Sequence, residues 1–175
     1  KKGIIFGALN AHSIAWKTAE RAHEERAEFV LTNAPAALKM GNLEVLAKKT
    51  KAQIIPADAT SIEDLENLIS KSMEILGGKI DFVLYSIGMS VNVRKGKSYT
   101  DPNYEFTTRG WNVSALSFHK VMHVLYHKKA MNSWGSIIAL SYMAAQRVFP
   151  DYNDMADNKA YLESIARSFG YFFRS

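Results

Sequence analysis

Residues 3–16 read GIIFGALNAHSIAW: a short apolar run, a glycine turn and the start of a helical pattern. The run from Gly3 to Ala8 predicts a buried β-strand that ends at Gly7, and Ser13 begins the next helix. Free amides and the helix dipole at such a helix start favour a pyrophosphate, with Ser13 and Ile14 as binding candidates. Of the glycine-rich G-x-G-x-x-G pattern only Gly7 remains, and judged alone Gly7 is more often an ordinary turn glycine.

The alternation of strand and helix continues along the chain. Further apolar runs predict strands at 28–33, 53–58, 80–88 and 135–141. Helical patterns predict helices at 13–25, 36–50, 61–76, 102–131 and from 153 onward. The prediction is an α/β fold, a Rossmann-like doubly wound parallel sheet with helices on both faces. Ligands bind such sheets beyond the carboxyl ends of the strands.

Composition predicts one domain over residues 1–175, with 47% apolar residues for its core. The absence of cysteine excludes disulfides and zinc–thiolate sites, and no metal site is predicted. The net charge is +5, but the basic residues are scattered, so no nucleic-acid partner is expected. The first apolar run is too short for a signal peptide or a membrane-spanning helix. We therefore expect a cytoplasmic protein without membrane insertion.

Two more predicted strand ends carry candidate ligand-binding residues. Asp58 and Ala59 follow the third strand, where an aspartate can hydrogen-bond an adenine amino group. Ser86, Ile87 and Gly88 close the fourth strand, where a glycine lets a cofactor ribose come close. Asp58 fits a helix N-terminal charge near Ser61 equally well, and Gly88 fits a turn.

Residues 140–160 read LSYMAAQRVFPDYNDMADNKA and place Tyr152 and Lys159 seven residues apart. Seven residues are close to two helical turns, so both side chains would share one face of a helix beginning near Asp151. A nearby ammonium could lower the phenol pKa by about two units, and such a tyrosine can donate a proton to an oxyanion. Taken alone, the pair fits an ordinary exposed helix face.

With these residues the chain resembles the enoyl-acyl carrier protein reductases of bacterial type II fatty-acid synthesis, a divergent branch of the short-chain dehydrogenase/reductase family. The likeness is strongest to sequences of Bacteroides-like bacteria. It rests on Gly7 with Ser13-Ile14-Ala15, on Ser86-Ile87-Gly88, and on Ser141-Tyr142 with Tyr152 and Lys159. Most short-chain dehydrogenases carry a serine thirteen residues before the catalytic tyrosine, where this chain has Ala139. Tyr142, ten residues before Tyr152, matches the enoyl reductases instead.

The resemblance implies NADH-dependent reduction of the trans-2 double bond of an enoyl thioester carried by acyl carrier protein, in a homo-oligomer that is a tetramer in related enzymes. Tyr152 would stabilise the enolate, Lys159 would hold the nicotinamide ribose, and Tyr142 would steer the thioester. The resemblance also implies an acyl pocket lined by Met89, Ser90 and Met155, although Met155 fits a core position equally well.

NADH is the predicted cofactor, in preference to NADPH. The residues after the second strand, Asn33-Ala34-Pro35, contain no arginine for a 2′-phosphate and also no acidic residue to repel one. Lys39 is near enough in sequence to keep NADPH as the alternative.

Several positions depart from the family pattern. Arg26 replaces a usual glycine between the first helix and second strand, Asn112 and Ser114 stand where an acidic residue is usual, and the chain ends at Ser175 inside its last helix. The family fold continues with further C-terminal strands, which would be missing here. The alternative is therefore a catalytically inactive NAD-binding Rossmann fragment or pseudoenzyme. We also expect an exposed edge at 135–141, aggregation or dimer formation, and negligible reductase activity of the isolated chain.

Overall fold

The computed structural model describes residues 1–174; the predicted domain also includes Ser175, which lies outside the described residues. The strands are β1 (Lys2–Phe6), β2 (Glu28–Thr32), β3 (Gln53–Ile54), β4 (Ile80–Tyr85) and β5 (Met131–Ala139). The α-helices are α1 (Ile14–Glu24), α2 (Pro35–Leu38), α3 (Leu43–Thr50), α4 (Ile62–Ile75), α5 (Val91–Arg94), α6 (Tyr104–Trp111), α7 (Ser117–His127) and α8 (Met155–Phe172). A π-helical turn, η1 (Asn112–Leu116), and two 3₁₀ turns, η2 (Met143–Ala145) and η3 (Pro150–Tyr152), complete the elements.

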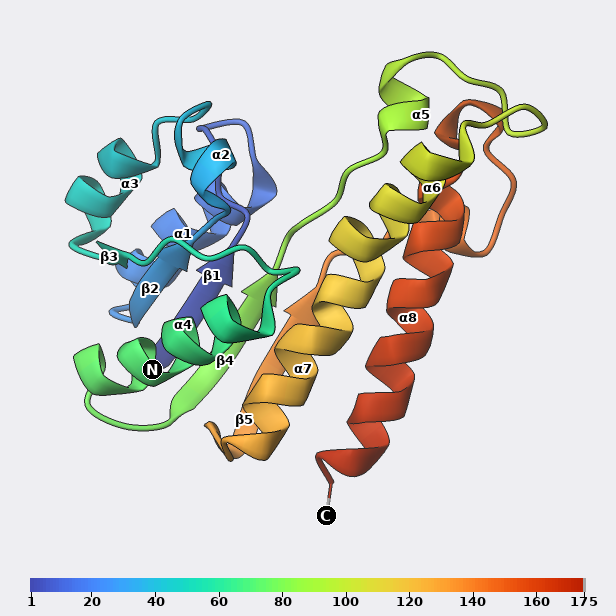
Figure 1. Cartoon of the computed structure of the whole chain (residues 1–175). Coiled ribbons are helices and arrows are strands. Elements are labelled where there is room, and N and C mark those ends of the chain that lie inside the picture. The colour runs from blue at the N-terminus through green and yellow to red at the C-terminus, as the bar shows by residue number, and fades with distance from the viewer. Residues whose placement is uncertain (175) are drawn as a thin grey trace.

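The five strands form one parallel sheet in the order β3-β2-β1-β4-β5. Every pairing is parallel, and β1 at the centre aligns Ile4 with Val30 of β2 and with Val83 of β4. From β1 the chain adds β2 and β3 on one side and then β4 and β5 on the other, so the strand order reverses at β1 (Figure 1). The predicted Rossmann-like fold is confirmed.

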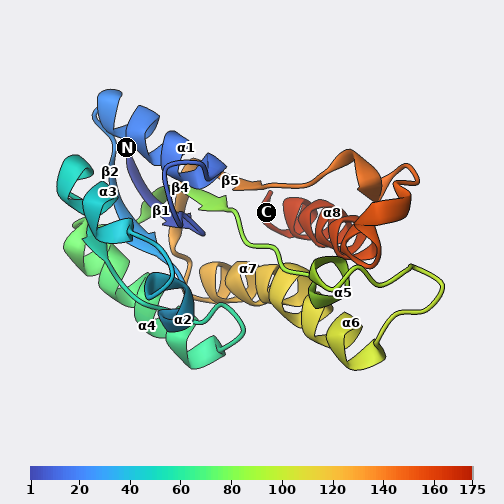
Figure 2. The same ribbon diagram turned by 90° about the horizontal axis from the view of Figure 1, so that it is seen from above.

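Alternate residues of β1 point to two separate hydrophobic cores. Ile4 and Phe6 belong to the core with α4, α7 and α8, whereas Ile5 belongs to the core with α1 and α3. Figure 2 shows α1 on one side of the sheet and α4 and α7 on the other. The prediction of helices on both faces is therefore confirmed. None of the helices in residues 1–174 is long and apolar enough to cross a membrane.

Two predicted helices are interrupted. The predicted helix 36–50 is split into α2 and α3, because Gly41 approaches Leu9 so closely that an added Cβ would lie 2.3 Å from the Leu9 carbonyl oxygen. The predicted helix 102–131 is divided by the π-helical turn at 112–116 into α6 and α7. The short helix α5, whose Ser90 hydroxyl accepts a hydrogen bond from the Val93 amide (3.0 Å), was not predicted.

Arg26 has a φ of 60°, as expected for a position where related chains carry glycine. A side chain with a Cβ is unfavourable in this left-handed conformation, at a cost of order 1 kcal/mol. The amide of Arg26 donates to the His23 carbonyl (2.9 Å), and the amide of Ala27 donates to Ala22 (2.9 Å), so the turn after α1 remains hydrogen-bonded.

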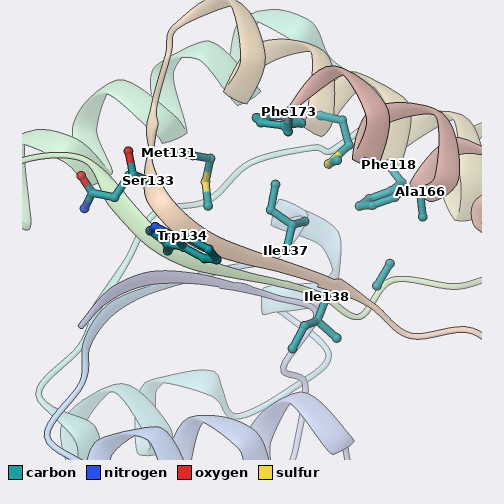
Figure 3. Close-up of a pocket in the computed structure, with 13 residues that line it drawn as sticks. Phe118, Met131, Ser133, Trp134, Ile137, Ile138, Ala166 and Phe173 are labelled. Carbon is teal, nitrogen blue, oxygen red and sulfur yellow. The ribbon is translucent and has the colours of Figure 1, made fainter. Parts of the chain in front are cut away.

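The prediction that every strand is buried is wrong for β5. This strand lies at the edge of the sheet, so the side chain of Trp134 is fully exposed and that of Ile138 is 54% exposed. Ile137 points instead toward α7 and α8 and borders a cavity of about 550 Å³, which Phe118 and Phe173 also line (Figure 3). The expected exposed edge is therefore confirmed.

The turn after β1 generates a stability prediction. Gly7 has a φ of +86°, and a Cβ there would lie 1.9 Å from the Ser86 carbonyl oxygen, so Gly7→Val should lower the free energy of unfolding by roughly 2–4 kcal/mol. Gly170→Ala is the matched control, because nothing lies within 4 Å of its Cβ position on α8, and it should stabilise by up to about 1 kcal/mol. Urea unfolding measures both changes, and equal effects would contradict this structure of the turn.

Candidate active site

Tyr152 and Lys159 approach the same end of the sheet, but not along one helix. Tyr152 ends the 3₁₀ turn η3, whereas α8 begins only at Met155. Asn153 between them has φ 44° and ψ −142°, a conformation that cannot continue a helix. The predicted helix through both residues, starting near Asp151, is therefore wrong, and Tyr152 is held by a turn.

Lys159 presents a buried ammonium next to the end of β4. The residue is 7% exposed, and its Nζ donates a hydrogen bond to the carbonyl of Leu140 (2.6 Å), directly after β5. Burial lowers the pKa of Lys159, because desolvation disfavours the charged form. Within residues 1–174 no carboxylate pairs with this ammonium. Its remaining N–H groups are thus available to a bound ligand.

Gly88 lies close to Met155 and Lys159. A Cβ at Gly88 would lie 2.6 Å from the Met155 methyl and 3.6 Å from Lys159 Nζ. The strand-end glycine and the buried lysine, 71 residues apart in sequence, are therefore neighbours in the fold. The turn interpretation of Gly88 does not account for this close approach.

Tyr152 lies beside a second tyrosine. The ring centroids of Tyr142 and Tyr152 are 4.7 Å apart, and the ring of Phe149 packs against Tyr142 with the centroids 5.4 Å apart. With Pro150 and Asp151 these aromatic residues line a small surface pocket of about 220 Å³. The pocket has room for a small part of a substrate between phenol groups.

The pKa of Tyr152 is raised, first by desolvation and then by the neighbouring Tyr142. The prediction that the lysine lowers this pKa by about two units is therefore wrong for this structure. Physically, burial disfavours the charged phenolate, and no lysine is among the groups that shift this pKa. Tyr152 thus remains protonated at neutral pH and can donate a hydrogen bond.

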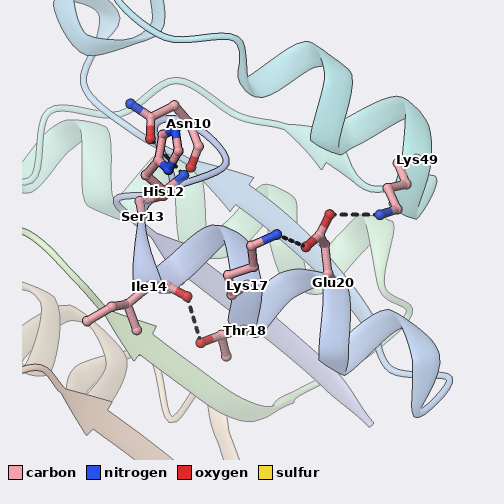
Figure 4. A network of polar contacts seen from close by, with 8 residues as sticks. All are labelled: Asn10, His12, Ser13, Ile14, Lys17, Thr18, Glu20 and Lys49. Atoms are coloured by element: carbon pink, nitrogen blue, oxygen red, sulfur yellow. Dashed lines mark hydrogen bonds and ion pairs between the residues drawn. The ribbon is translucent and has the colours of Figure 1, made fainter.

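The loop between β1 and α1 is organised around Ser13 (Figure 4). The Ser13 hydroxyl donates to the Asn10 carbonyl (2.8 Å) and accepts from the Leu9 amide (3.2 Å). The amides of Ile14 and Ala15 have no acceptor among the described residues. These two amides lie at the positive end of α1, where the sequence predicts an anion to bind. Ser13 itself shapes the loop.

Gly7 is required for a different reason from the predicted one. The side of Gly7 where a Cβ would project is filled by the backbone of Ser86, at 1.9 Å, and not by open space for a ligand. The Gly7 amide donates to the Thr32 carbonyl (3.1 Å). Gly7 therefore lets β1 and the end of β4 pack closely, and the expectation that it gives a ligand access to the backbone is corrected.

The structure favours the ordinary interpretation of Asp58 and Ala59. The Asp58 Oδ1 accepts hydrogen bonds from the amide (2.9 Å) and hydroxyl (2.8 Å) of Thr60, so its carboxylate stabilises the turn before α4. The side chain of Ala59 is buried in the core. The strand β3 ends at Ile54, four residues earlier than predicted, which moves Asp58 away from the strand end. Ile87, one residue before Gly88, packs against the core.

The predicted pocket residues separate into two groups. Met155 is buried against Gly88, and the backbone of Met89 is fixed by Ser114, whose hydroxyl accepts from the Met89 amide (2.8 Å) and donates to its carbonyl (2.9 Å). Ser90 is buried, and its hydroxyl donates to Asp154 Oδ1 (2.5 Å). The expectation that the Ser90 side chain lines the pocket is therefore corrected.

Two polar residues of this region were missed by the sequence analysis. Asp154 is buried and accepts hydrogen bonds from Ser90 and Asn92, and Asn158 is buried with an Oδ1 that has no partner among the described residues. Both lie within the quoted stretch 140–160. The sequence signal for both was a polar residue at a position of the last predicted helix that should face the core.

Comparison with known proteins agrees with this geometry. The parallel sheet with helices on both faces defines a Rossmann-type domain, the fold of the short-chain dehydrogenase/reductase class. A sequence profile described as Enoyl-(Acyl carrier protein) reductase matches residues 7–175, and the chain belongs to this family.

Individual relatives cover nearly all of the chain. The structure of a FabI–NADH complex from Alistipes finegoldii is 61% identical, with a TM-score of 0.96, over 99% of this chain and 61% of that one. The enoyl-[acyl-carrier-protein] reductase [NADH] 1 of Rhizobium meliloti is 35% identical over 168 residues, which are 95% of this chain and 60% of the relative. The Aquifex aeolicus enzyme structure is 29% identical, with a TM-score of 0.88, over 99% of this chain and 68% of that one. The chain thus spans about three fifths of the first two relatives.

The state of the phenol can be measured directly. In protein labelled with ¹³C at the tyrosine ring carbon that bears the hydroxyl, the resonance assigned to Tyr152 through Tyr152→Phe should titrate above the ordinary value of about 10. The protonated form is present below that pKa and is lost as the pH rises through it. Titration clearly below 10 would show that Lys159, and not desolvation, sets the state of the phenol.

Proposed function

We propose that this chain is the cofactor-binding and catalytic part of an NADH-dependent enoyl-acyl carrier protein reductase, which reduces the trans-2 double bond of enoyl thioesters in fatty-acid elongation. The proposal rests above all on the paired phenols of Tyr142 and Tyr152, together with the buried ammonium of Lys159 seven residues further along the chain. Family membership and the names of the relatives support it.

The residues fit a dinucleotide. The free amides of Ile14 and Ala15 would hold the pyrophosphate, and Lys159 would donate to the nicotinamide ribose next to Gly88. The Asn33 amide group is already engaged, with Nδ2 donating to the Ala8 carbonyl (3.2 Å) and Oδ1 accepting from the Ala34 amide (3.0 Å). Because no arginine follows Asn33 before Lys39, a 2′-phosphate lacks its usual partner, which favours NADH over NADPH.

When bound, NADH supplies the hydride for the β-carbon of the enoyl thioester. Tyr152 donates a hydrogen bond to the thioester oxygen, which gains negative charge as the double bond is reduced. Its raised pKa keeps the proton in place until that charge develops. Tyr142 would hold the thioester end against the Tyr152 ring, and Met89 and Met155 would border the acyl chain.

The partners follow from this reaction and from the surface. The substrate would be an enoyl thioester on acyl carrier protein. The helices α7 and α8 expose large apolar side chains that a second copy of the chain would cover, which supports a homo-oligomer. They are Tyr126, Tyr161, Tyr171 and Phe172. A sequence without cysteine suits a reducing compartment, and we propose the cytoplasm.

The first test of this function is turnover. Oxidation of NADH by a crotonyl thioester, followed at 340 nm, should fall about 100-fold in kcat in Tyr152→Phe, because the hydrogen bond to the developing charge is lost. The control is Tyr104→Phe, an exposed phenol on α6, which should leave kcat unchanged. The assay is run on the chain and on a fusion with the C-terminal part of the Alistipes finegoldii enzyme. NADH binding without turnover in the fusion would instead support the inactive nucleotide-binding domain.

A second test uses the pH dependence of NADH affinity. The protonated ammonium of Lys159 is present below its lowered pKa, so the affinity should fall as the pH rises through a value below the ordinary 10.4 of lysine. Lys159→Met should weaken binding at neutral pH and abolish this alkaline decrease. Lys71→Met, at an exposed position on α4, should retain it. An unchanged decrease in Lys159→Met would remove Lys159 from the cofactor site.

A further inference from the structure

A buried carboxylate joins the first turn of α8 to the segment that begins α5. Asp154 is 2% exposed, and each of its carboxylate oxygens accepts a hydrogen bond from a different side chain. Ser90 Oγ donates to Oδ1 (2.5 Å), and Asn92 Nδ2 donates to Oδ2 (2.6 Å). Ser90 and Asn92 are also buried, so these bonds are shielded from water.

The carboxylate is stabilised without a cation. No lysine, arginine or histidine within residues 1–174 forms an ion pair with Asp154. The residue is the N-cap of α8, where the helix dipole stabilises negative charge, and its carbonyl accepts from the Asn158 amide (3.1 Å). The two donors and the helix end therefore fix both the charge and the orientation of the side chain.

The neighbouring Asn153 is held in the same way. Its φ of 44° is unfavourable for a residue with a Cβ, and its side chain bonds on both sides of the turn. Nδ2 donates to the Lys97 carbonyl (2.5 Å), and Oδ1 accepts from the Asp154 amide (2.6 Å). Because this strained turn is the only covalent link between Tyr152 and α8, its conformation decides where the phenol lies relative to Lys159.

We propose that Asp154 is a positioning residue for Tyr152, fixing the 152–154 turn against α5 and with it the place of the phenol relative to α8. The predicted loss of turnover rests on the proposed function. The predicted effect on the position of Tyr152 does not. Asp154 acts through Asn153 and touches neither substrate nor cofactor.

The test substitutes the carboxylate conservatively. In Asp154→Asn one acceptor oxygen becomes an NH₂ group and the negative charge is lost, so the bond to Ser90 or the bond to Asn92 must reverse or break and the turn should loosen. The ¹³C resonance of Tyr152 should then shift, and its pKa should fall toward the ordinary value as the phenol becomes more solvated. In the active fusion, kcat should fall at least about tenfold, with the Kd for NADH changed less than about twofold, because a small misplacement of a catalytic group affects the reaction more than binding.

Ser98→Ala is the matched control, since Ser98 lies exposed in the segment after α5 and its hydroxyl bonds only to Thr100 among the described residues. It should leave the Tyr152 resonance and kcat unchanged. If Asp154→Asn does not fold, Ser90→Ala removes one of the two donors and should produce the same changes at smaller size. A folded Asp154→Asn protein with an unshifted Tyr152 resonance would overturn the proposal. If the Tyr152 resonance shifts in Asp154→Asn but the unsubstituted fusion shows no turnover, the proposed function is wrong and the positioning role of Asp154 still holds.

Discussion

The hydrogen bond from Lys159 Nζ to the Leu140 carbonyl is the contact on which the site depends. It joins α8 to the chain at the point where β5 ends, so the last helix and the edge strand are fixed relative to each other. Ser141 adds a second tie one residue later, because its hydroxyl donates to Glu163 Oε1 (2.7 Å) on the next turn of α8. Both ties place the ammonium beside Gly88.

Hydrophobic packing makes this contact possible. Leu162 and Ile165, on the face of α8 that carries Lys159, are buried in the core with Phe118 of α7. Burying an ammonium without a carboxylate is costly, and one carbonyl acceptor offsets only part of that cost. An anionic or hydroxyl-rich ligand beside Gly88 would supply the missing acceptors. The pKa of Lys159 is lowered for the same reason, because burial disfavours the charged form.

The sequence contained enough information for the fold and for the main site residues. Apolar runs near Ile4, Val30 and Val83 predicted the central strands, because a strand buried on both faces must be apolar throughout. The spacing of Tyr152 and Lys159 gained its meaning only with the family resemblance, which also singled out Tyr142. The roles of these three residues stay predictions, and the helix predicted through Tyr152 and Lys159 does not exist.

The remaining features depend on contacts between distant parts of the chain. The role of Gly7 follows from the backbone of Ser86, 79 residues away, and the Asp154 network joins residues about 60 apart. No local pattern encodes either contact. The exposed edge at β5 was predicted from its place as the last strand of the sheet and not from its apolar sequence, since burial depends on which elements cover a strand.

A crystal structure of this chain with NADH tests the central claim most directly. The account predicts the pyrophosphate within hydrogen-bond distance of the Ile14 and Ala15 amides, and the nicotinamide ribose within hydrogen-bond distance of Lys159 Nζ, next to Gly88. A nucleotide bound instead in the cavity between β5 and α8, or a Lys159 still bonded to Leu140 alone, would contradict it.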